Sequence, residues 1–451
     1  MPSLPQAFLS SLSGLLGEAD ASRAVSAMEA ASSVSVRLNP FKVPEGGIDV
    51  LEGSSPVAWS PYGRLLVGRP SFTLDPLFHA GAYYVQDSSA MFVGWLFRSL
   101  LERFPERPLR VLDLCAAPGG KTTDLAASLR EACGDAFLLV SNEVMRQRAA
   151  VLSDNVALWG DPNVVVTSVD PGAFASLPGF FDVVVADVPC SGEGMFRKDA
   201  KAVEDWSPGN VELCAARQRR IIADVWPALR GGGVLLYSTC TFEDAENDSN
   251  LEWIAEELGG DIVPAANPFG IRTTRHGHLL IPGEVPGDGQ WAGALIKRSG
   301  PLARELSEPP APPVRGMGDR FARPSHDSAG GRREHPSDSA AEWRGQSFEA
   351  VKRFRPLRMG VPQGQVKGKD FIPDPDMALS LAFDRTRYPE AEADLRTALH
   401  FLHRDTIVLD GAPLGYNVIT YRGLPLGFVK NLGRRCNNLH PQSRRIRMDI
   451  V

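Results

Sequence analysis

Six short apolar runs alternate with amphipathic segments between residues 109 and 298. Each run has the length and the β-branched content of a buried strand. The runs are Arg110–Leu114, Phe137–Val140, Val164–Val169, Phe181–Ala186, Val234–Ser238 and Ala292–Lys297. Strands that alternate with helices are typical of a mostly parallel sheet covered on both faces. The pattern therefore predicts a doubly wound α/β domain.

The segment before this domain has a different pattern. Leu4–Leu16 and Ala19–Ala31 have helical periodicity, whereas Val34–Leu38 and Leu65–Val67 are short β-like runs. A change of pattern on this scale is typical of a domain boundary. We therefore expect a small α+β domain over residues 1–75 and the main domain over residues 76–298.

Two further regions follow the main domain. Residues 299–345 are rich in Pro, Gly, Ser and charge and show no period, so they cannot bury enough apolar surface to order themselves. Residues 346–451 regain apolar runs, with Asp394–His403 expected as a helix and Thr406–Val408 and Asn417–Tyr421 as strands. We expect a flexible linker and then a small α+β or β-barrel module.

Composition narrows the class of protein. The 451 residues are 43% hydrophobic and 23% charged, as in an ordinary globular protein, and no stretch approaches the roughly 20 apolar residues of a membrane span. The N-terminus lacks the pattern of a secretory signal, so we expect a cytoplasmic protein. None of the six cysteines forms a Cys-x-x-Cys pair, which favours reduced thiols and no metal site.

The charge is unevenly distributed. A net charge of −6 argues against a uniformly basic nucleic-acid binder. Residues 421–451 nevertheless carry seven basic side chains against one acid, Asp449. The basic residues are Arg422, Lys430, Arg434, Arg435, Arg444, Arg445 and Arg447. Such a cluster predicts a surface that contacts a polyanion.

Acidic residues stand at or after four predicted strands: Asp113, Glu143, Asp170 and Asp187. Ligands of an open parallel sheet bind at the carboxyl ends of its strands. One acid at such a place is usually a turn former or a helix cap. Four together predict a binding site at this edge.

The turn after the first predicted strand is rich in small residues. It consists of Cys115, Ala116, Ala117, Pro118, Gly119, Gly120, Lys121 and Thr122. It has neither the P-loop spacing nor the dinucleotide Gly-x-Gly-x-x-Gly pattern. A nucleotide-like ligand without a phosphate chain remains, with Glu143 on its ribose hydroxyls and Asp170 near an adenine amino group.

Two cysteines stand at the ends of neighbouring predicted strands. Cys190 lies in Asp187-Val-Pro-Cys-Ser-Gly-Glu-Gly, and Cys240 lies in Tyr237-Ser-Thr-Cys-Thr. A free cysteine often packs as a small hydrophobic residue, which we expect for the other thiols at Cys133, Cys214 and Cys436. Two thiols and an acid in one crevice instead indicate chemistry.

Three long segments then resemble a known family in their sequence and order. LDLCAAPGGKT, DVPCSGEGMFRKD and YSTCTFEDAEND are similar to the signature segments of the Nol/Nop/Sun family of RNA cytosine-5 methyltransferases. HAGAYYVQDSSAM resembles that family's approach segment, with Asp87 and Ser88 where Glu-Pro is more usual. LRMG and LGYNVITYRGLPLGFVKN resemble the PUA-like extension of bacterial members that act on small-subunit ribosomal RNA. RRCNNLHPQSRR departs from the lysine-rich ending of those members.

The resemblance implies a Rossmann-like core that uses S-adenosylmethionine and acts on RNA. Carbon 5 of cytosine is a poor nucleophile, so a thiolate first adds to carbon 6. The resemblance assigns this attack to Cys240 and a part in product release to Cys190. Asp187 would hold ring nitrogen 3, and Lys121 would contact the cofactor or the catalytic centre. The cofactor would be bound by residues 115–121, Glu143, Arg148, Asp170 and Asp187.

Other readings share some of these features. A DNA cytosine-5 methyltransferase would use Cys190 as its nucleophile, and the complete Ser-Thr-Cys segment argues against it. A transfer-RNA methyltransferase of the same family, or a noncatalytic RNA-binding protein that assists ribosome assembly, remains open. A small-molecule methyltransferase would need neither the basic module nor two thiols. The sequence does not indicate the modified cytosine or the oligomeric state.

Overall fold

The computed structural model describes residues 3–105, 108–264, 266–299, 338–368 and 370–450. Most of the predicted linker lies outside these residues. Its last part does not: residues 338–345 begin the helix α10, Asp338–Val351. The linker prediction was therefore wrong at its C-terminal end. Among the described residues, no helix combines the length and the apolar character that crossing a bilayer requires.

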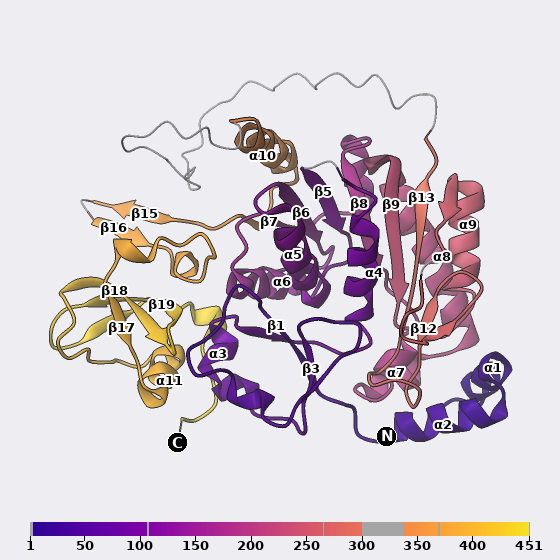
Figure 1. Cartoon of the computed structure of the whole chain (residues 1–451), viewed down its shortest axis with the longest axis horizontal. Helices are drawn as coiled ribbons and strands as arrows, with labels where there is room; N and C mark the ends of the chain where they lie inside the picture. The colour runs from indigo at the N-terminus through magenta and orange to yellow at the C-terminus, as the bar shows by residue number, and fades with distance from the viewer. Residues whose placement is uncertain (1–2, 106–107, 265, 300–337, 369, 451) are drawn as a thin grey trace.

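A large twisted sheet forms the centre of the molecule (Figure 1). Its strand order is β11-β12-β13-β9-β8-β5-β6-β7-β14, and β10 also pairs with β13. The parallel strands are β5 Leu109–Asp113, β6 Phe137–Asn142, β7 Val164–Thr167, β8 Phe181–Asp187 and β9 Leu229–Thr239. The antiparallel strands are β10 Gly260–Ile262, β11 Arg272–Thr273, β12 His278–Leu280, β13 Gln290–Lys297 and β14 Arg358–Met359. The predicted doubly wound α/β core is confirmed.

Helices cover both faces of this sheet (Figure 1). Side chains alternate between the faces along each strand, so Val111 belongs to one core and Leu112 to the other. The first core is covered by α4 Phe92–Leu101, α5 Gly120–Cys133 and α6 Arg146–Trp159. The second is covered by α8 Pro208–Val225, α9 Asp248–Glu257 and α10. The short helix α7 is Ala200–Asp205. Burial on both faces explains the continuous apolar runs of the strands.

The N-terminal region consists of two helices and a small sheet. The helices α1 Gln6–Leu16 and α2 Glu18–Glu29 pack on the second core, where the ring of Phe8 lies 5.2 Å from that of Phe196. The sheet has the order β2-β3-β1-β4. Its strands are β1 Ser35–Leu38, β2 Ser55–Pro56, β3 Gly63–Leu65 and β4 Tyr83–Val85. Because β4 pairs with β1, this sheet extends past residue 75.

The C-terminal module is built around a second small sheet, of order β17-β18-β19-β20. Its elements are β17 Glu390–Glu392, α11 Leu395–His403, β18 Gly415–Tyr421, β19 Leu424–Asn431 and β20 Cys436–Asn438. A hairpin of β15 Gly364–Lys367 and β16 Asp370–Pro373 precedes it. Thr406–Val408 is not a strand, although the carbonyl of Ile407 accepts a hydrogen bond from Cys436.

The module shares an apolar core with the N-terminal sheet and with the short helix α3, Pro76–His79. Buried side chains of both regions meet there, among them Val36, Tyr83, Phe401 and Ile419. Residues before Gly360 belong elsewhere, because α10 packs on the second core and β14 pairs with β7. The region predicted to start at residue 346 thus begins inside the main domain.

Candidate active site

The carboxyl ends of the parallel strands lie at one edge of the sheet, and the loop after β5 crosses it. The N–H of Ala116 donates to the carbonyl of Asn142 at 2.8 Å, which ties the loop to the end of β6. Gly119 has a φ of 116°, a left-handed conformation that suits glycine, and it precedes the first turn of α5. The loop therefore presents backbone to a ligand at a helix N-terminus.

Asp113 lies beneath this loop. Its side chain is fully buried and accepts a hydrogen bond from the Thr122 hydroxyl at 2.6 Å. Burial raises the pKa of Asp113 to about 7, and the Thr122 hydrogen bond opposes that rise. Its Oδ1 atom is buried without a hydrogen-bond partner among the described residues. A buried acceptor atom without a hydrogen-bond donor costs free energy in a folded protein.

Glu143 follows β6 and is 3% exposed. One carboxylate oxygen accepts from the N–H of Met145 at 2.9 Å, and the other lies 3.3 Å from Nη1 of Arg148. Arg148 also donates to the carbonyl of Ala117 at 3.0 Å. Arg148 therefore links Glu143 to the loop after β5.

The structure gathers three of the four predicted acids and leaves one apart. Asp113, Glu143 and Asp187 all act electrostatically on Cys115, and with burial they raise the pKa of its thiol. Asp170 is exposed, lies three residues beyond β7 and caps a 3-10 turn by accepting from the N–H of Gly172 at 2.9 Å. No contact among the described residues joins Asp170 to the other three.

Asp187 ends β8 and is held by three donors. Its Oδ2 lies 2.7 Å from Nζ of Lys121, while Oδ1 accepts from Ser238 Oγ at 2.7 Å and from Gln290 Nε2 at 3.1 Å. Burial alone would lower the pKa of Lys121, but the Asp187 carboxylate outweighs burial and holds that pKa above its ordinary value. The pair is an ammonium and a carboxylate fixed at the strand ends.

The two thiols meet next to this ion pair. Cys190 Sγ and Cys240 Sγ are 3.2 Å apart in a hydrogen bond, and both residues are half-buried. The N–H of Gly194 donates to the carbonyl of Cys240 at 2.7 Å and draws the Cys190 loop over β9. A Cβ at Gly194 would lie 3.0 Å from that carbonyl oxygen, so a larger residue would crowd this close approach.

The charges around the two thiols differ. The hydrogen bond with Cys240 and burial raise the pKa of the Cys190 thiol well above its ordinary range, and Glu246 and Glu193 add to the rise. Lys121, in contrast, interacts favourably with a thiolate at Cys240. Burial and the nearby carboxyl groups therefore oppose a thiolate at Cys190, whereas Lys121 lies where it would stabilise one at Cys240.

Sequence analysis missed three residues of this site: Gln290, Ser238 and Glu246. Gln290 begins β13, two residues before the predicted start of that strand, and Ser238 was read as part of an apolar run. Glu246 is fully buried and accepts from the N–H of Ser191 at 3.1 Å and from Nε2 of Gln218 at 2.6 Å. For Ser238 and Gln290 the available signal was a polar residue within an apolar strand, whereas Glu246 lies between β9 and α9.

The predicted basic cluster is partly neutralised. Arg422 pairs with Asp49, Lys430 with Asp370, and Arg444 with Asp376. Of the remaining basic side chains, Arg434, Arg435 and Arg447 are exposed and have no ion pair within the described part of the chain. Within this cluster, these three and the half-buried Arg445 are the basic side chains that have no ion pair in the described part of the chain.

Three protein-family models match the chain in order. Residues 4–88 match the N-terminal domain of 16S rRNA methyltransferase RsmF, residues 101–294 match 16S rRNA methyltransferase RsmB/F, and residues 388–446 match the methyltransferase RsmF PUA domain. The first match ends close to the end of the N-terminal sheet. The three matches correspond to the three described regions.

Curated proteins show the same similarity over most of their length. Ribosomal RNA small subunit methyltransferase F of Serratia proteamaculans (strain 568) is 31% identical over 388 residues, which cover 80% of this chain and 78% of that protein. The protein of that name from Escherichia coli O139:H28 is 28% identical over 447 residues and covers 90% of this chain and 89% of its own.

Solved structures agree on the fold. A methyltransferase homologue from Pyrococcus horikoshii has a TM-score of 0.54 and 25% identity, covering 65% of this chain and 95% of its own. NSun6 from Pyrococcus horikoshii, solved with SFG, has a TM-score of 0.54 and 19% identity, covering 65% of this chain and 98% of its own. SFG is an analogue of S-adenosylmethionine.

Proposed function

The chain belongs to the family of ribosomal RNA small subunit methyltransferases F, and we propose from this premise that it methylates carbon 5 of a cytosine in 16S ribosomal RNA. The resemblance to the Nol/Nop/Sun family is thereby confirmed. The observation that carries the proposal is the contact of the Cys190 and Cys240 sulfurs at 3.2 Å beside the Asp187–Lys121 ion pair. A cytoplasmic location follows from the proposed substrate.

S-adenosylmethionine is the cofactor of this family, and when bound it supplies an electrophilic methyl group. The residues at the edge of the sheet fit such a ligand. Asp113 offers a buried acceptor without a donor, Glu143 offers a carboxylate, and the loop of residues 115–120 offers backbone N–H groups. Val144 and Met145 are 57% and 55% exposed and offer apolar surface for an adenine ring.

Cys240 is the proposed nucleophile. Its thiolate adds to carbon 6 of the cytosine, a carbon–sulfur bond forms, and the electrons of the carbon 5–carbon 6 double bond make carbon 5 nucleophilic. The Lys121 ammonium and the thiol of Cys190 both favour a negative charge on the Cys240 sulfur. The geometry thus supports attack by Cys240 rather than by Cys190.

Asp187 and Lys121 act on the polar edge of the base. An ionised Asp187 can accept a hydrogen bond from the exocyclic amino group or from a protonated ring nitrogen 3. Lys121 can donate to the negative charge that develops on the ring during attack. Ser238 and Gln290 orient the carboxylate by donating to its Oδ1 atom. No metal is required for these contacts.

Cys190 is proposed to act in product release. The carbon 5 proton must leave, its electrons restore the double bond, and Cys240 departs as a thiolate. The Cys190 sulfur lies 3.2 Å from the Cys240 sulfur, so it stays beside the ring that Cys240 binds, and burial and the nearby carboxyl groups make its thiolate a strong base once it forms. Cys190 can then lose its proton to solvent and accept the carbon 5 proton, so the cycle releases one proton overall.

The alternatives are weaker. A DNA-type mechanism would need the thiolate on Cys190, where Glu193 and Glu246 oppose it. The two relatives compared above carry names that specify small-subunit ribosomal RNA, which supports a ribosomal rather than a transfer-RNA substrate. The C-terminal module, which matches a PUA domain, is proposed to bind the ribosomal RNA without taking part in the chemistry.

Bisulfite sequencing of small-subunit ribosomal RNA from cells with and without the gene tests this function. We expect at least one cytosine that resists conversion only when the gene is present, and a Cys240→Ala gene should not restore the resistance. An identical pattern in both strains, with the wild-type protein present in one, would contradict the proposal. If the strain without the gene loses resistant cytosines only in transfer RNA, a transfer-RNA substrate would be favoured instead.

A further inference from the structure

We propose that Gln290 is a positioning residue that fixes the carboxylate of Asp187 and the backbone beside Cys240 in one arrangement. The inference rests on the proposed function, which gives Asp187 and Cys240 their roles. Gln290 is 2% exposed, and its Nε2 donates to Asp187 Oδ1 at 3.1 Å and to the carbonyl of Thr239 at 2.8 Å. The amide group of Gln290 therefore donates one hydrogen to Asp187 and the other to the backbone next to Cys240.

The hydrogen-bond partners at position 290 explain why a glutamine stands there. Both partners of Nε2 are acceptors, so the position calls for a side chain with two N–H groups. The antiparallel register pairs Trp291 with Thr239, so the preceding residue, Gln290, lies opposite Cys240. An apolar side chain would leave the Asp187 and Thr239 oxygens without this donor, and buried polar groups are normally paired.

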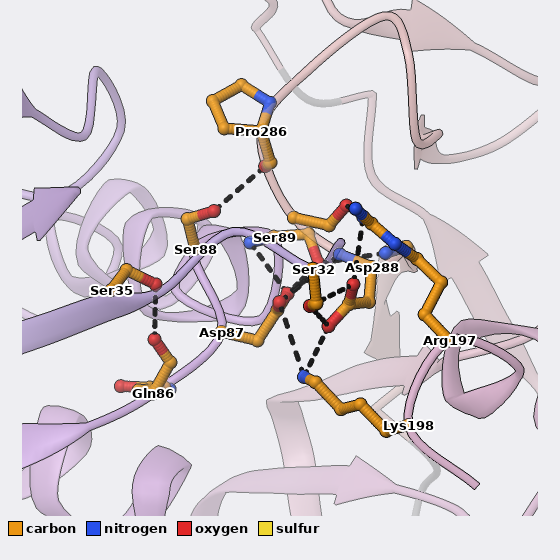
Figure 2. Close-up of polar contacts among 12 residues, drawn as sticks. Ser32, Ser35, Gln86, Asp87, Ser88, Ser89, Arg197, Lys198, Pro286 and Asp288 are labelled. Carbon is orange, nitrogen blue, oxygen red and sulfur yellow. Dashed lines mark hydrogen bonds and ion pairs between the residues drawn. The ribbon is translucent and has the colours of Figure 1, made fainter. Parts of the chain in front are cut away.

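The segment before Gln290 is clamped from outside the site. Figure 2 shows Arg197 and Lys198 reaching the carboxylate of Asp288 from one element and Ser32 from another. Nη1 of Arg197 lies 3.0 Å from Asp288 Oδ1, and the Ser32 hydroxyl donates to the same oxygen at 2.7 Å. Asp288 is 3% exposed, so these contacts fix the start of β13.

The approach segment holds the same stretch of backbone. The N–H of Asp288 donates to the carboxylate of Asp87 at 3.2 Å, and the N–H of Gly289 donates to Ser89 Oγ at 3.1 Å (Figure 2). Gly289 has a φ of 117°, and a Cβ there would lie 2.6 Å from the ring of Phe242. The backbone of Gln290 is therefore fixed by contacts that do not involve the substrate.

This clamp also reaches the second thiol. Lys198 contacts both Asp87 and Asp288, and it ends the loop that begins at Cys190. The start of β13, the Cys190 loop and the approach segment are thus joined in one network, with Gln290 at its inner end. Gln290 is the point at which the network touches Asp187.

The variant Gln290→Met keeps the side-chain size and removes both donors. The Asp187 carboxylate then keeps only Lys121 and Ser238 as donors, and the Thr239 carbonyl loses its side-chain donor. We expect the single-turnover methylation rate to fall about tenfold or more, with KM for RNA within about threefold.

The variant Gln290→Glu keeps the shape and replaces the N–H donors by a carboxyl group. As the pH rises and this group ionises, it repels Asp187 and the Thr239 carbonyl. Its rate should therefore fall as the pH rises, whereas the rate of Gln290→Met, which has no group to ionise at this position, should not show this additional fall. A side chain that only fills space predicts the same pH dependence for both variants. Gln290→Glu also keeps the test decisive if Gln290→Met does not fold.

Ser238→Ala is the matched control, because it removes another donor to Asp187 Oδ1 and leaves the Thr239 contact intact. All variants are assayed as full chains with S-adenosylmethionine and small ribosomal subunits from cells that lack the gene. Ser238→Ala should lose less of its single-turnover rate than Gln290→Met, because the Thr239 contact remains. A Gln290→Met single-turnover rate equal to wild type, or a loss that appears only in KM for RNA, would overturn the inference. A wild-type chain that transfers no methyl group contradicts the proposed function instead.

Discussion

At the scale of single residues, the two thiols differ through the charges that face them. Cys190 lies over the buried carboxyl groups of Glu193 and Glu246, whereas Cys240 faces the ammonium of Lys121. The sequence motifs identify both thiols, Asp187 and Lys121. The position of Glu246 beneath Ser191 depends on the packing of α8 and β9, which no local pattern encodes.

Glu143→Ala tests the proposed ribose contact. The carboxylate is nearly buried and already aligned by Met145 and Arg148, so little ordering opposes its use by a ligand. Loss of a charged hydrogen bond should cost about 1.5 to 3 kcal/mol, which corresponds to a roughly 10- to 150-fold weaker S-adenosylmethionine Kd by calorimetry.

Asp170→Ala is the matched control for this measurement, because Asp170 is exposed and caps its own turn. The sequence proposed an adenine contact for Asp170, and a large loss of affinity in this variant would support it. Wild-type affinity in Glu143→Ala would show that the ribose assignment is wrong.

At the scale of elements, the apolar runs predicted the parallel strands of the main sheet well. Burial on both faces makes β5 to β9 nearly continuous apolar runs, which is the strongest signal a strand can give. The pattern failed where strands pair outside that core. Gln290 is polar, so β13 appeared to begin at Ala292, and Thr406–Val408 is extended but lacks a sheet partner.

The helix α10 was hidden in the predicted linker for a related reason. Its contacts with the apolar core come from Trp343, Phe348, Ala350 and Val351, within a stretch that also contains charges and Gly345. Two packed turns are enough to hold α10 on the core once β14 pairs with β7. Such long-range pairing cannot be deduced from composition.

The buried cluster of Asp376 with Arg358 and Arg444 joins β14 to the end of the chain. Asp376→Ala would leave two arginines, with side chains 12% and 7% exposed, without their counter-charge. We expect the free energy of unfolding in urea to fall by about 3 to 5 kcal/mol. The exposed pair of Asp370 with Lys430 is the control, and Asp370→Ala should cost less than about 1 kcal/mol.

The same cluster predicts a pH dependence. Burial alone would raise the pKa of Asp376, but Arg444 and Arg358 outweigh it, and the folded pKa lies below the ordinary value. A depressed carboxyl pKa gives stability that is present above the unfolded pKa and lost as the pH falls through the folded value. The difference between wild type and Asp376→Ala should therefore shrink in acid. A difference that stays constant down to the acid transition would contradict this assignment.

At the scale of the whole molecule, the C-terminal module is part of a continuous body rather than an appended domain. It shares its apolar core with the N-terminal sheet, and Arg422 at the β18–β19 turn pairs with Asp49. Deleting residues 346–451 would expose that core and remove β14 as well. RNA binding by the module is therefore better tested with point substitutions.

The double variant Arg434→Ala and Arg435→Ala tests RNA binding by the module. Both side chains are exposed and lack an ion pair within the described chain, so they are available to phosphates. We expect weaker binding of small-subunit ribosomal RNA and a salt slope reduced by about two. Arg422→Ala is the control, because its guanidinium is engaged at 2.8 Å by Asp49, and its slope should match wild type. An unchanged slope in the double variant would remove the module from the RNA interface.

The most direct test of the account is the fate of the RNA in the two cysteine variants. Full-length Cys190→Ala and Cys240→Ala are incubated with S-adenosylmethionine and small-subunit ribosomal RNA, and protein-linked RNA is separated on a denaturing gel. The account predicts that Cys190→Ala accumulates a covalent adduct that carries the new methyl group, and that Cys240→Ala forms neither adduct nor methylated RNA. An adduct in Cys240→Ala that is absent from Cys190→Ala would contradict the assignment of the nucleophile.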